Sequence, residues 1–450
     1  MNKYKKQVNR IKRKLWLAKI IDWRRKVFGA KSHNYKIGKP VSENELIAFE
    51  EKYSIVLPED YKVFLKMIGN GGTSRSNSAA GPYYGIDPLG VNIDLITDEP
   101  ETYLSKPVRV YPNMTDENWS ELIEEIENNK SGQASNDLMG EIYGGILPIG
   151  SQGCAFIHSL VLNGKYKGKV INLELPMQKP KFAFDDNFLD WYERWLDEII
   201  SGELLRKDAS PFGYTMKGTG EELLEQYCLT SDCEIRKECL LGILDKKTIN
   251  TALIEQIEKE YHVADIKLRA ILLQILSKFD FKKAKPYLIQ LSNTDLFATY
   301  KILFWYAKDK SSYWLDIVKN SSNRINEKKT FISYCSLLQL TNIDYFNLLK
   351  PFTQNSDPGI RKWAFKTLGS LNFKPEYLET FVLGLRDNSK FVITATLESL
   401  SDVKEPSLLK YYKEVSDRFP SDKDVVYIHL VRRLNEMGLS LRELKDMNFN

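Results

Sequence analysis

The second half of the chain carries a repeated motif that limits what it can fold into. An acidic or polar residue is followed four positions later by a basic or polar residue in most copies, and an apolar helical stretch comes next. Copies begin at Asp232, Asp265, Asp295, Asp357 and Asp387, which lie 33, 30, 62 and 30 residues apart. Helix pairs that repeat every 30–33 residues are typical of an α-solenoid, because each pair can bury its apolar face only against its neighbours. We therefore predict an all-α repeat domain over residues 219–450.

Two details refine this prediction. The gap of 62 residues equals two periods, so one degenerate copy is expected near Asn326, and a last copy at Asp422 or Asp424. The stretch from Asp357 to Ala364 resembles a HEAT-type repeat. That resemblance implies that Asp357 caps a helix and that Arg361 bridges neighbouring repeats.

The other end of the chain is strongly basic. Residues 1–31 hold twelve Lys or Arg and one acid, Asp22, which gives a charge of +11. Because the whole chain carries +4, the remainder carries −7. We predict a basic amphipathic helical arm over residues 1–35. Its apolar residues form two lines, the first made of Ile11, Leu15 and Ala18 and the second of Trp16, Ile20, Trp23 and Val27.

Two interpretations of this arm stay open. In the first, the helix packs its tryptophan line on its own protein. In the second, it binds an acidic partner, an anionic membrane surface or nucleic acid. We expect no direct nucleic-acid partner, and the basic arm is the part of the chain that would touch an anionic surface.

Residues 36–204 follow an α+β pattern. Ser42 and Glu45 form a capping box before a first helix, and Pro58 starts a second helix that stops at residues 69–72. A short strand is expected at residues 83–86 and another amphipathic helix around residues 119–126. Three strands at residues 145–149, 155–162 and 168–175 precede a closing helix at residues 188–200, and Asn163-Gly164 marks a hairpin turn. We predict an antiparallel sheet with flanking helices, and a linker over residues 205–218.

The same region resembles the SMI1/KNR4 family of the SUKH superfamily. The resemblance rests on an acidic first helix around Glu45, Phe49 and Tyr53, the run Leu57-Pro58-Glu59-Asp60-Tyr61, and the stop at Asn70-Gly71-Gly72. Leu147-Pro148-Ile149-Gly150, Gly168-Lys169-Val170 and the aromatic helix at Phe188 follow in order. The stretch from Asn92 to Gly140 is longer than the usual middle of the family.

This resemblance implies a non-enzymatic, protein-binding module. Bacterial members of the family resemble immunity proteins that neutralise polymorphic or contact-dependent toxins, often nucleases, so a toxin domain is the expected partner. The alternative is a regulatory or adaptor scaffold that acts in cell-wall synthesis or signalling, as fungal relatives do. We predict that the sheet face and its loops bind the partner. The candidate partner-binding residues are Asn70, Gly71, Gly72, Arg75, Tyr83, Tyr84 and Asp87.

Few cysteine and histidine residues of the sequence are spaced in a way that suits catalysis or metal binding. Cys154 and His158 are too far apart along a strand to act as nucleophile and base. Cys228, Cys233 and Cys239 miss the spacing of a zinc site. We therefore predict no catalytic, metal-binding or cofactor-binding residues and no enzyme activity. Five cysteines fit a reducing compartment, and no apolar run is long enough to cross a membrane, so a cytoplasmic protein is expected.

Overall fold

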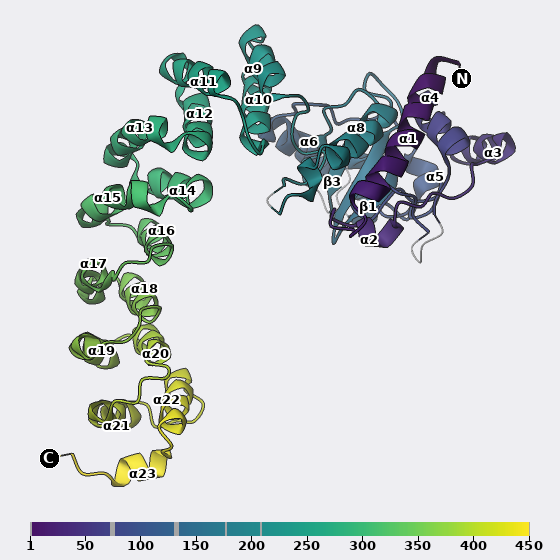
Figure 1. The fold of residues 1–450 in the computed structure, drawn as a ribbon. Helices are drawn as coiled ribbons and strands as arrows, with labels where there is room; N and C mark the ends of the chain where they lie inside the picture. Colours follow the sequence, from purple (N-terminus) through teal and green to yellow (C-terminus); the bar gives the residue numbers. More distant parts are fainter. Residues whose placement is uncertain (1, 73–76, 130–134, 176–177, 208, 450) are drawn as a thin grey trace. The chain divides into compact units, whose positions relative to one another are not determined.

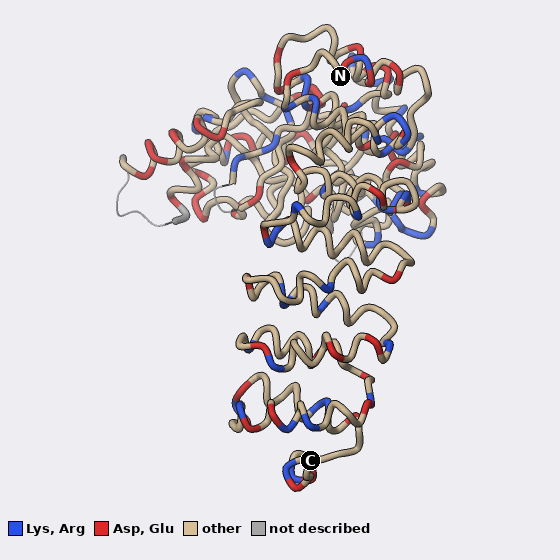
Figure 2. The backbone as a smooth tube through the Cα atoms, turned by 90° about the vertical axis from the view of Figure 1, so that its left-hand side faces the viewer, with Lys and Arg blue, Asp and Glu red and all other residues tan. Residues whose placement is uncertain are grey.

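The computed structural model describes residues 2–72, 77–129, 135–175, 178–207 and 209–449. The chain divides into two compact units, Met1–Leu253 and Ile254–Asn450. Figure 1 shows strands in the first unit and helices alone in the second. Charged residues of both signs are spread over the helices of the second unit (Figure 2), so the contrast between basic and acidic segments lies in the first.

The first unit is built around a small antiparallel sheet. Its order is β1-β2-β3-β4, and the register pairs Ile157 with Leu173 across β2 and β3. The strands are β1 (Ile146–Gly153), β2 (Phe156–Val161), β3 (Val170–Glu174) and β4 (Lys181–Phe182). The helices are α1 (Lys5–Ile21), α2 (Ala30–His33), α3 (Glu43–Tyr53), α4 (Glu59–Val63), the π-helical turn η2 (Phe64–Ile68), α5 (Pro100–Tyr103), α6 (Asp116–Asn129), α7 (Ser135–Ile142), α8 (Phe188–Ile200), α9 (Gly220–Leu229) and α10 (Cys233–Asp245); 3-10 turns lie at Asn2–Tyr4 and Glu203–Leu205.

Successive side chains on a strand point to opposite sides, and here each side of the sheet packs into a core of its own, so both faces are buried. The prediction that the sheet face binds a partner is therefore wrong, and its loops alone stay candidates. Leu147 and Leu160 join one core with residues of α1, α3, α4 and α8. Ile146 and Ile171 join the other core with residues of α6 and α7. The predicted α+β class with an antiparallel sheet and flanking helices is thereby confirmed.

The closing helix and the first two helices of the α+β region agree closely with the sequence. Helix α8 spans Phe188–Ile200 as predicted, and the Asn187 side chain caps it by accepting a hydrogen bond from the Asp190 backbone N–H. The predicted capping box of Ser42 and Glu45 opens α3. Pro58 is the N-cap of α4, one position earlier than predicted.

Two local predictions are wrong. Residues 83–86 form no strand; an isolated bridge joins Ala79 to Ile86, because the positive φ of Tyr83 (54°) and of Gly85 (104°) prevents a regular extended run. The basic arm is not one helix, because α1 ends at Ile21. The Asp22 carboxylate accepts hydrogen bonds from the Lys26 and Val27 backbone N–H groups and fixes a turn there.

Helix α1 packs through its isoleucine line and not through its tryptophan line. Ile11 and Ala18 are fully buried against the first core, together with Val8. Trp16 and Trp23 are 61 % and 68 % exposed. The interpretation in which the tryptophan line packs on its own protein is therefore wrong, although the helix itself is an integral part of the unit.

The segment predicted as a linker packs against the domain that precedes it. Phe212 is buried against Trp191, with 5.7 Å between ring centroids, and the Arg194 guanidinium donates to the Thr215 carbonyl oxygen at 2.7 Å. The Ser210 hydroxyl donates to the Asp245 carboxylate of α10 at 2.7 Å. These contacts fasten residues 209–216, and the domain division at residues 205–218 stays a prediction.

The second unit is a stack of helices in two rows (Figure 1). Each helix of one row contacts the next along it, as α14, α16, α18, α20 and α22 do. The helices are α11 (Thr251–Val263), which spans the division between the units, α12 (Ile266–Phe279), α13 (Phe281–Thr294), α14 (Leu296–Tyr306), α15 (Ser311–Ser321), α16 (Lys328–Gln339), α17 (Phe346–Leu349), α18 (Pro358–Leu368), α19 (Leu378–Leu385), α20 (Lys390–Ser399), α21 (Leu409–Arg418), α22 (Val425–Glu436) and α23 (Leu441–Asp446), with 3-10 turns at Ser322–Arg324, Lys350–Gln354, Pro375–Tyr377 and Pro406–Leu408.

The repeated aspartates act as helix caps, which explains the period. The side chain that caps the first turn is Asp232 in α10, Asp265 in α12, Asp295 in α14, Asp357 in α18 and Asp424 in α22. Asp387 differs, because the N-cap of α20 is Ser389. The Asp387 carboxylate instead accepts two hydrogen bonds from the Arg361 guanidinium, at 2.7 and 2.8 Å. Arg361 therefore bridges neighbouring repeats. The region is helical and repeat-like; its HEAT-like character stays a prediction.

Candidate protein-binding surfaces

The predicted turn at Asn70–Gly72 is held by its own backbone and side chains. The Asn70 side-chain oxygen accepts a hydrogen bond from the Leu89 backbone N–H at 2.8 Å. Gly71 has a φ of 57°, and a Cβ there would lie 2.7 Å from the Asn77 carbonyl oxygen. Gly72 donates its N–H to the same oxygen at 2.6 Å. These residues shape the loop, and their contact with a partner stays a prediction. Arg75 lies outside the described residues.

The remaining candidate partner-binding residues differ in how far they are buried. Asp87 is buried and accepts hydrogen bonds from Ser78 at 3.0 Å and Asn92 at 2.9 Å, and burial raises its pKa. The half-buried Tyr83 donates its hydroxyl to the Phe212 carbonyl oxygen at 3.2 Å. Tyr84 is exposed, and its ring meets Phe28 edge-on at 5.7 Å. Among the described candidates, Tyr84 is therefore the side chain that is most open to a partner.

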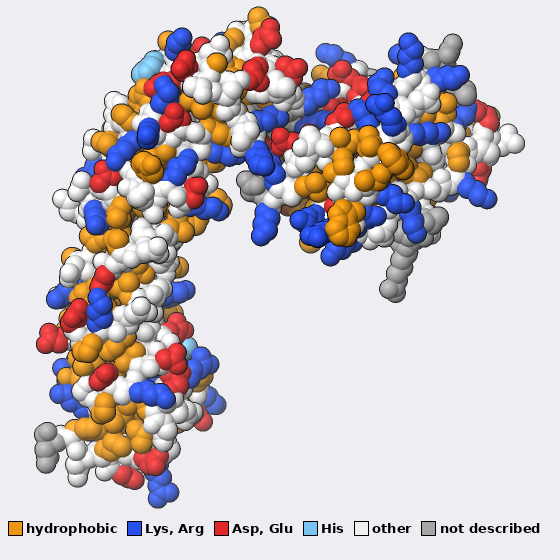
Figure 3. Space-filling model, viewed as in Figure 1, with side chains coloured by type: hydrophobic (Ala, Val, Ile, Leu, Met, Phe, Trp, Pro, Cys, Tyr) orange, Lys and Arg blue, Asp and Glu red, His pale blue; other side chains and the backbone are white. Residues whose placement is uncertain are grey.

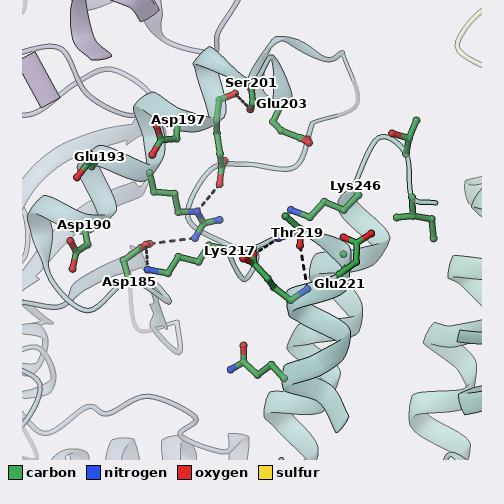
Figure 4. A pocket seen from close by; sticks show the side chains of 18 of the residues that line it. Asp185, Asp190, Glu193, Asp197, Ser201, Glu203, Lys217, Thr219, Glu221 and Lys246 are labelled. Atoms are coloured by element: carbon green, nitrogen blue, oxygen red, sulfur yellow. Dashed lines mark hydrogen bonds and ion pairs between the residues drawn. The ribbon is translucent and has the colours of Figure 1, made fainter. Parts of the chain in front are cut away.

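An acid-lined pocket opens between α8 and the start of α9 (Figure 4). Its volume is about 1160 Å³. Three cationic side chains, Arg194, Lys217 and Lys246, also line it, which leaves an excess of five negative charges. The carboxylates are those of Asp185, Asp190, Glu193, Asp197, Glu198, Glu203, Glu221 and Glu222.

The floor of the pocket is neutralised by ion pairs. The buried Arg194 lies between Glu198 at 2.6 Å and Asp185 at 3.3 Å. Lys217 also approaches Asp185, at 3.3 Å, as Figure 4 shows. Burial raises the pKa of Glu198, and the adjacent Arg194 opposes this shift. Arg194 and Asp185 are therefore part of the internal packing, whereas the side chain of Lys217 is half exposed.

The wall formed by α8 is partly neutralised from α1. Glu193 pairs with Arg10 at 2.9 Å and with Lys14 at 2.8 Å. Burial alone would raise the pKa of Glu193, but the hydrogen bonds from these two cations outweigh it and the pKa is lowered. Asp197 also accepts from Lys14, yet half of its side chain is exposed.

Asp197 on α8 and Glu221 and Glu222 on α9 are exposed at the rim. Glu222 is held in the capping box of α9 and Glu221 accepts a hydrogen bond from the Asn250 side chain, so we take Asp197 and Glu221 as the rim carboxylates that a partner would meet.

Sequence reasoning predicted an acidic body but missed this pocket. The signal that points to it is the spacing of Asp190, Glu193 and Asp197, which places three acids on one face of the closing helix. Their apposition to Glu221 and Glu222 depends on how residues 205–218 fold back, and local patterns do not specify that path.

The histidine and cysteine side chains with possible chemistry lie in separate places. His158 is fully buried on β2, where Asn172 lies 2.9 Å from its Nδ1, and burial lowers its pKa to about 3. Cys154 lies in the turn between β1 and β2, with a φ of 51°, and not on the strand. The Cys239 thiol is buried and its pKa is raised to about 11. Within the described ranges, no group of three or more His, Cys, Asp or Glu side chains is arranged to hold a metal ion.

Helices that cross a bilayer need a long, almost uncharged stretch. In the part of the chain that the structure describes, no helix has that length and apolar character.

Comparison with known proteins gives one match. Residues 40–194 match the SMI1 / KNR4 family (SUKH-1), which covers the sheet and helices α3 to α8 up to Arg194. No curated protein and no solved structure matches the chain significantly. At family level the match supports a protein-binding or immunity-type module. Residues 40–194 thus form an SMI1/KNR4 (SUKH-1) domain, which a helical, repeat-like region follows in the chain.

Proposed function

We propose that this protein is an immunity-type protein that binds a toxin domain with a basic surface and blocks it without chemical conversion. The observation that carries the proposal is the excess of acids around the pocket between α8 and α9, which is three negative charges once Arg10 and Lys14 of α1 are counted with the eight acids and three cations of the lining. Support at family level comes from the SUKH-1 match over residues 40–194.

The physical argument concerns the charge of the partner. A toxin that cuts nucleic acid needs Lys and Arg to hold phosphates, so its active surface is basic. Carboxylates at the rim, Asp197 and Glu221, would pair with such cations in place of the phosphates. Opposite charge across the encounter speeds association and favours this partner over acidic ones.

The test is neutralisation in cells. The full chain is co-expressed with a nuclease toxin domain whose gene neighbours its own, where the genome holds one, and growth is compared with that of cells expressing the toxin alone. We expect wild-type protein to restore growth and the double variant Asp197→Asn/Glu221→Gln to restore less.

The matched control is Glu124→Gln, which removes an exposed acid on α6 away from the pocket lining. It should protect as well as the wild type. Equal protection by all three proteins would contradict a role for the pocket, and no protection by the wild type would contradict the immunity function.

A regulatory or adaptor scaffold is the second candidate, favoured by a groove in the second unit. Trp305 and Ile266 line it and are 65 % and 83 % exposed, beside Tyr261 and Arg269. Such side chains suit a peptide or helix from a partner. If Trp305→Ala abolishes partner binding while the pocket variants leave it unchanged, the scaffold function is favoured over the immunity function.

A further inference from the structure

The outer face of α1 combines large apolar and cationic side chains. Opposite the buried Val8, Ile11 and Ala18, this face presents Trp16 and Ile20, which are 61 % and 49 % exposed. The turn that follows adds Trp23 at 68 % and Phe28 at 60 % exposure. Soluble domains usually keep such side chains scattered, so four of them within thirteen residues mark an interaction site. Figure 3 shows hydrophobic side chains gathered on the first unit, with Lys and Arg around them.

Cations without acidic partners surround these apolar side chains. None of the following forms an ion pair with any residue that the structure describes: Lys12, Arg13, Lys19, Arg24, Lys26 and Lys31. The Arg24 guanidinium lies over the Trp23 ring at 4.6 Å. Asp22 is the one acid in residues 1–42, and it is buried with an oxygen 2.9 Å from the Tyr35 hydroxyl. We call these six cations, with Trp16, Ile20, Trp23 and Phe28, the basic–aromatic face.

We propose that the basic–aromatic face docks on the surface of an anionic lipid bilayer. Lipid phosphates and anionic headgroups complement six unpaired cations, and tryptophan side chains favour the boundary between headgroups and acyl chains. The aliphatic side chain of Ile20 distinguishes the occupant, because it can enter an acyl layer but gains nothing against a sugar–phosphate backbone. Nucleic acid is therefore the less suited anionic partner, and an acidic protein is distinguished by the experiment below.

The fold presents this face already formed. Many interfacial helices fold only when they reach the membrane and lose affinity to that ordering. Here the inner face of α1 is buried, and Arg10 and Lys14 fasten the helix to Glu193 of α8. Residues 32–253 carry −13 against the +11 of residues 1–31, so a negative surface would attract this face and repel the rest of the first unit.

The experiment is co-sedimentation of the full chain with vesicles of phosphatidylcholine alone or with about 30 % phosphatidylserine. We expect binding to the anionic vesicles alone, weakened by salt. The double variant Lys12→Gln/Lys19→Gln should lose about five-fold in affinity for each charge removed. Trp16→Ala/Trp23→Ala should lose about ten-fold or more, because it removes the inserting side chains.

The matched control is Trp305→Ala, an equally exposed tryptophan of the second unit, which should bind vesicles as the wild type does. Circular dichroism of each variant confirms that the fold is retained. The proposal is overturned if wild-type protein ignores anionic vesicles, if it binds both vesicle types equally, or if Trp305→Ala weakens binding as much as the α1 variants. Tighter binding to an oligonucleotide or to an acidic polypeptide than to the vesicles would equally overturn it. None of these results depends on the proposed toxin.

Discussion

Replacing Phe64 by alanine tests the packing that joins the two most recognisable segments of the SUKH-1 domain. Phe64 is fully buried, and its ring meets those of Phe188 and Tyr192 of α8 edge-on, at 5.0 and 4.9 Å between centroids. Losing the buried ring costs about 1.5–3 kcal/mol in transfer free energy, and the cavity left behind raises the total to about 3–5 kcal/mol. For a unit of this size, that corresponds to a fall of roughly 6–20 °C in Tm.

The assay is urea denaturation followed by near-ultraviolet circular dichroism, which reports the aromatic cluster. Phe28→Ala is the matched control, because Phe28 is a phenylalanine of the same unit but is 60 % exposed. It should change the unfolding free energy by less than about 1 kcal/mol. If Phe64→Ala changes the free energy as little as Phe28→Ala does, then Phe64 is not a core residue and the packing of α4 and η2 on α8 is wrong.

Three further predictions concern pH, the repeats and the chain division. Burial lowers the pKa of His33 to about 4 and of His158 to about 3. Below pH 6.5 both histidines therefore bind protons in the unfolded chain but stay neutral in the folded chain. Each histidine then lowers the unfolding free energy by about 1.4 kcal/mol for each pH unit below that point. Urea titrations from pH 7 to pH 5 should therefore show that the unfolding free energy of His33→Gln/His158→Gln changes less steeply with pH than that of the wild type. An unchanged dependence on pH would refute this. In the second unit, Arg361→Ala and Asp387→Ala should each lower the unfolding free energy by about 1.5–3 kcal/mol, and the double variant should lose no more than either single variant. If the two losses add up in the double variant, the two residues do not act as a pair. Despite the contacts that fasten residues 209–216, limited proteolysis should cut first within residues 205–218, and a first cut inside residues 223–400 would contradict a division there.

Much of the fold could be predicted because the patterns that specify it are local. Helix capping depends on residues two or three positions apart, so the sequence alone predicts the aspartate caps at Asp265 and Asp357 and the capping box at Ser42. Helix α8 was readable because its apolar stripe is long. The SUKH resemblance rested on the run from Leu57 to Tyr61, whose Tyr61 is indeed buried in the core.

The features that sequence reasoning missed depend on contacts between distant segments. Two apolar lines on α1 looked equivalent, and only the docking of α1 on α8 decides that Ile11 is buried while Trp16 is exposed. Asp22 gave no local sign that its carboxylate would end the helix. The acid-lined pocket arises from α8 and α9, whose approach is set by the packing of Phe212 on Trp191.

The pocket's role is tested most directly by the association rate of the full chain with the toxin domain encoded beside its gene. Stopped-flow mixing at about 50 mM and about 500 mM salt would compare wild-type protein, Asp197→Asn/Glu221→Gln and Glu124→Gln. We predict that salt slows wild-type association more than it speeds dissociation. The pocket variant should associate about two- to five-fold more slowly than wild type at low salt and equally fast at high salt, whereas Glu124→Gln follows the wild type. Association that ignores salt, or an equal loss in Glu124→Gln, would contradict capture through the acid-lined pocket.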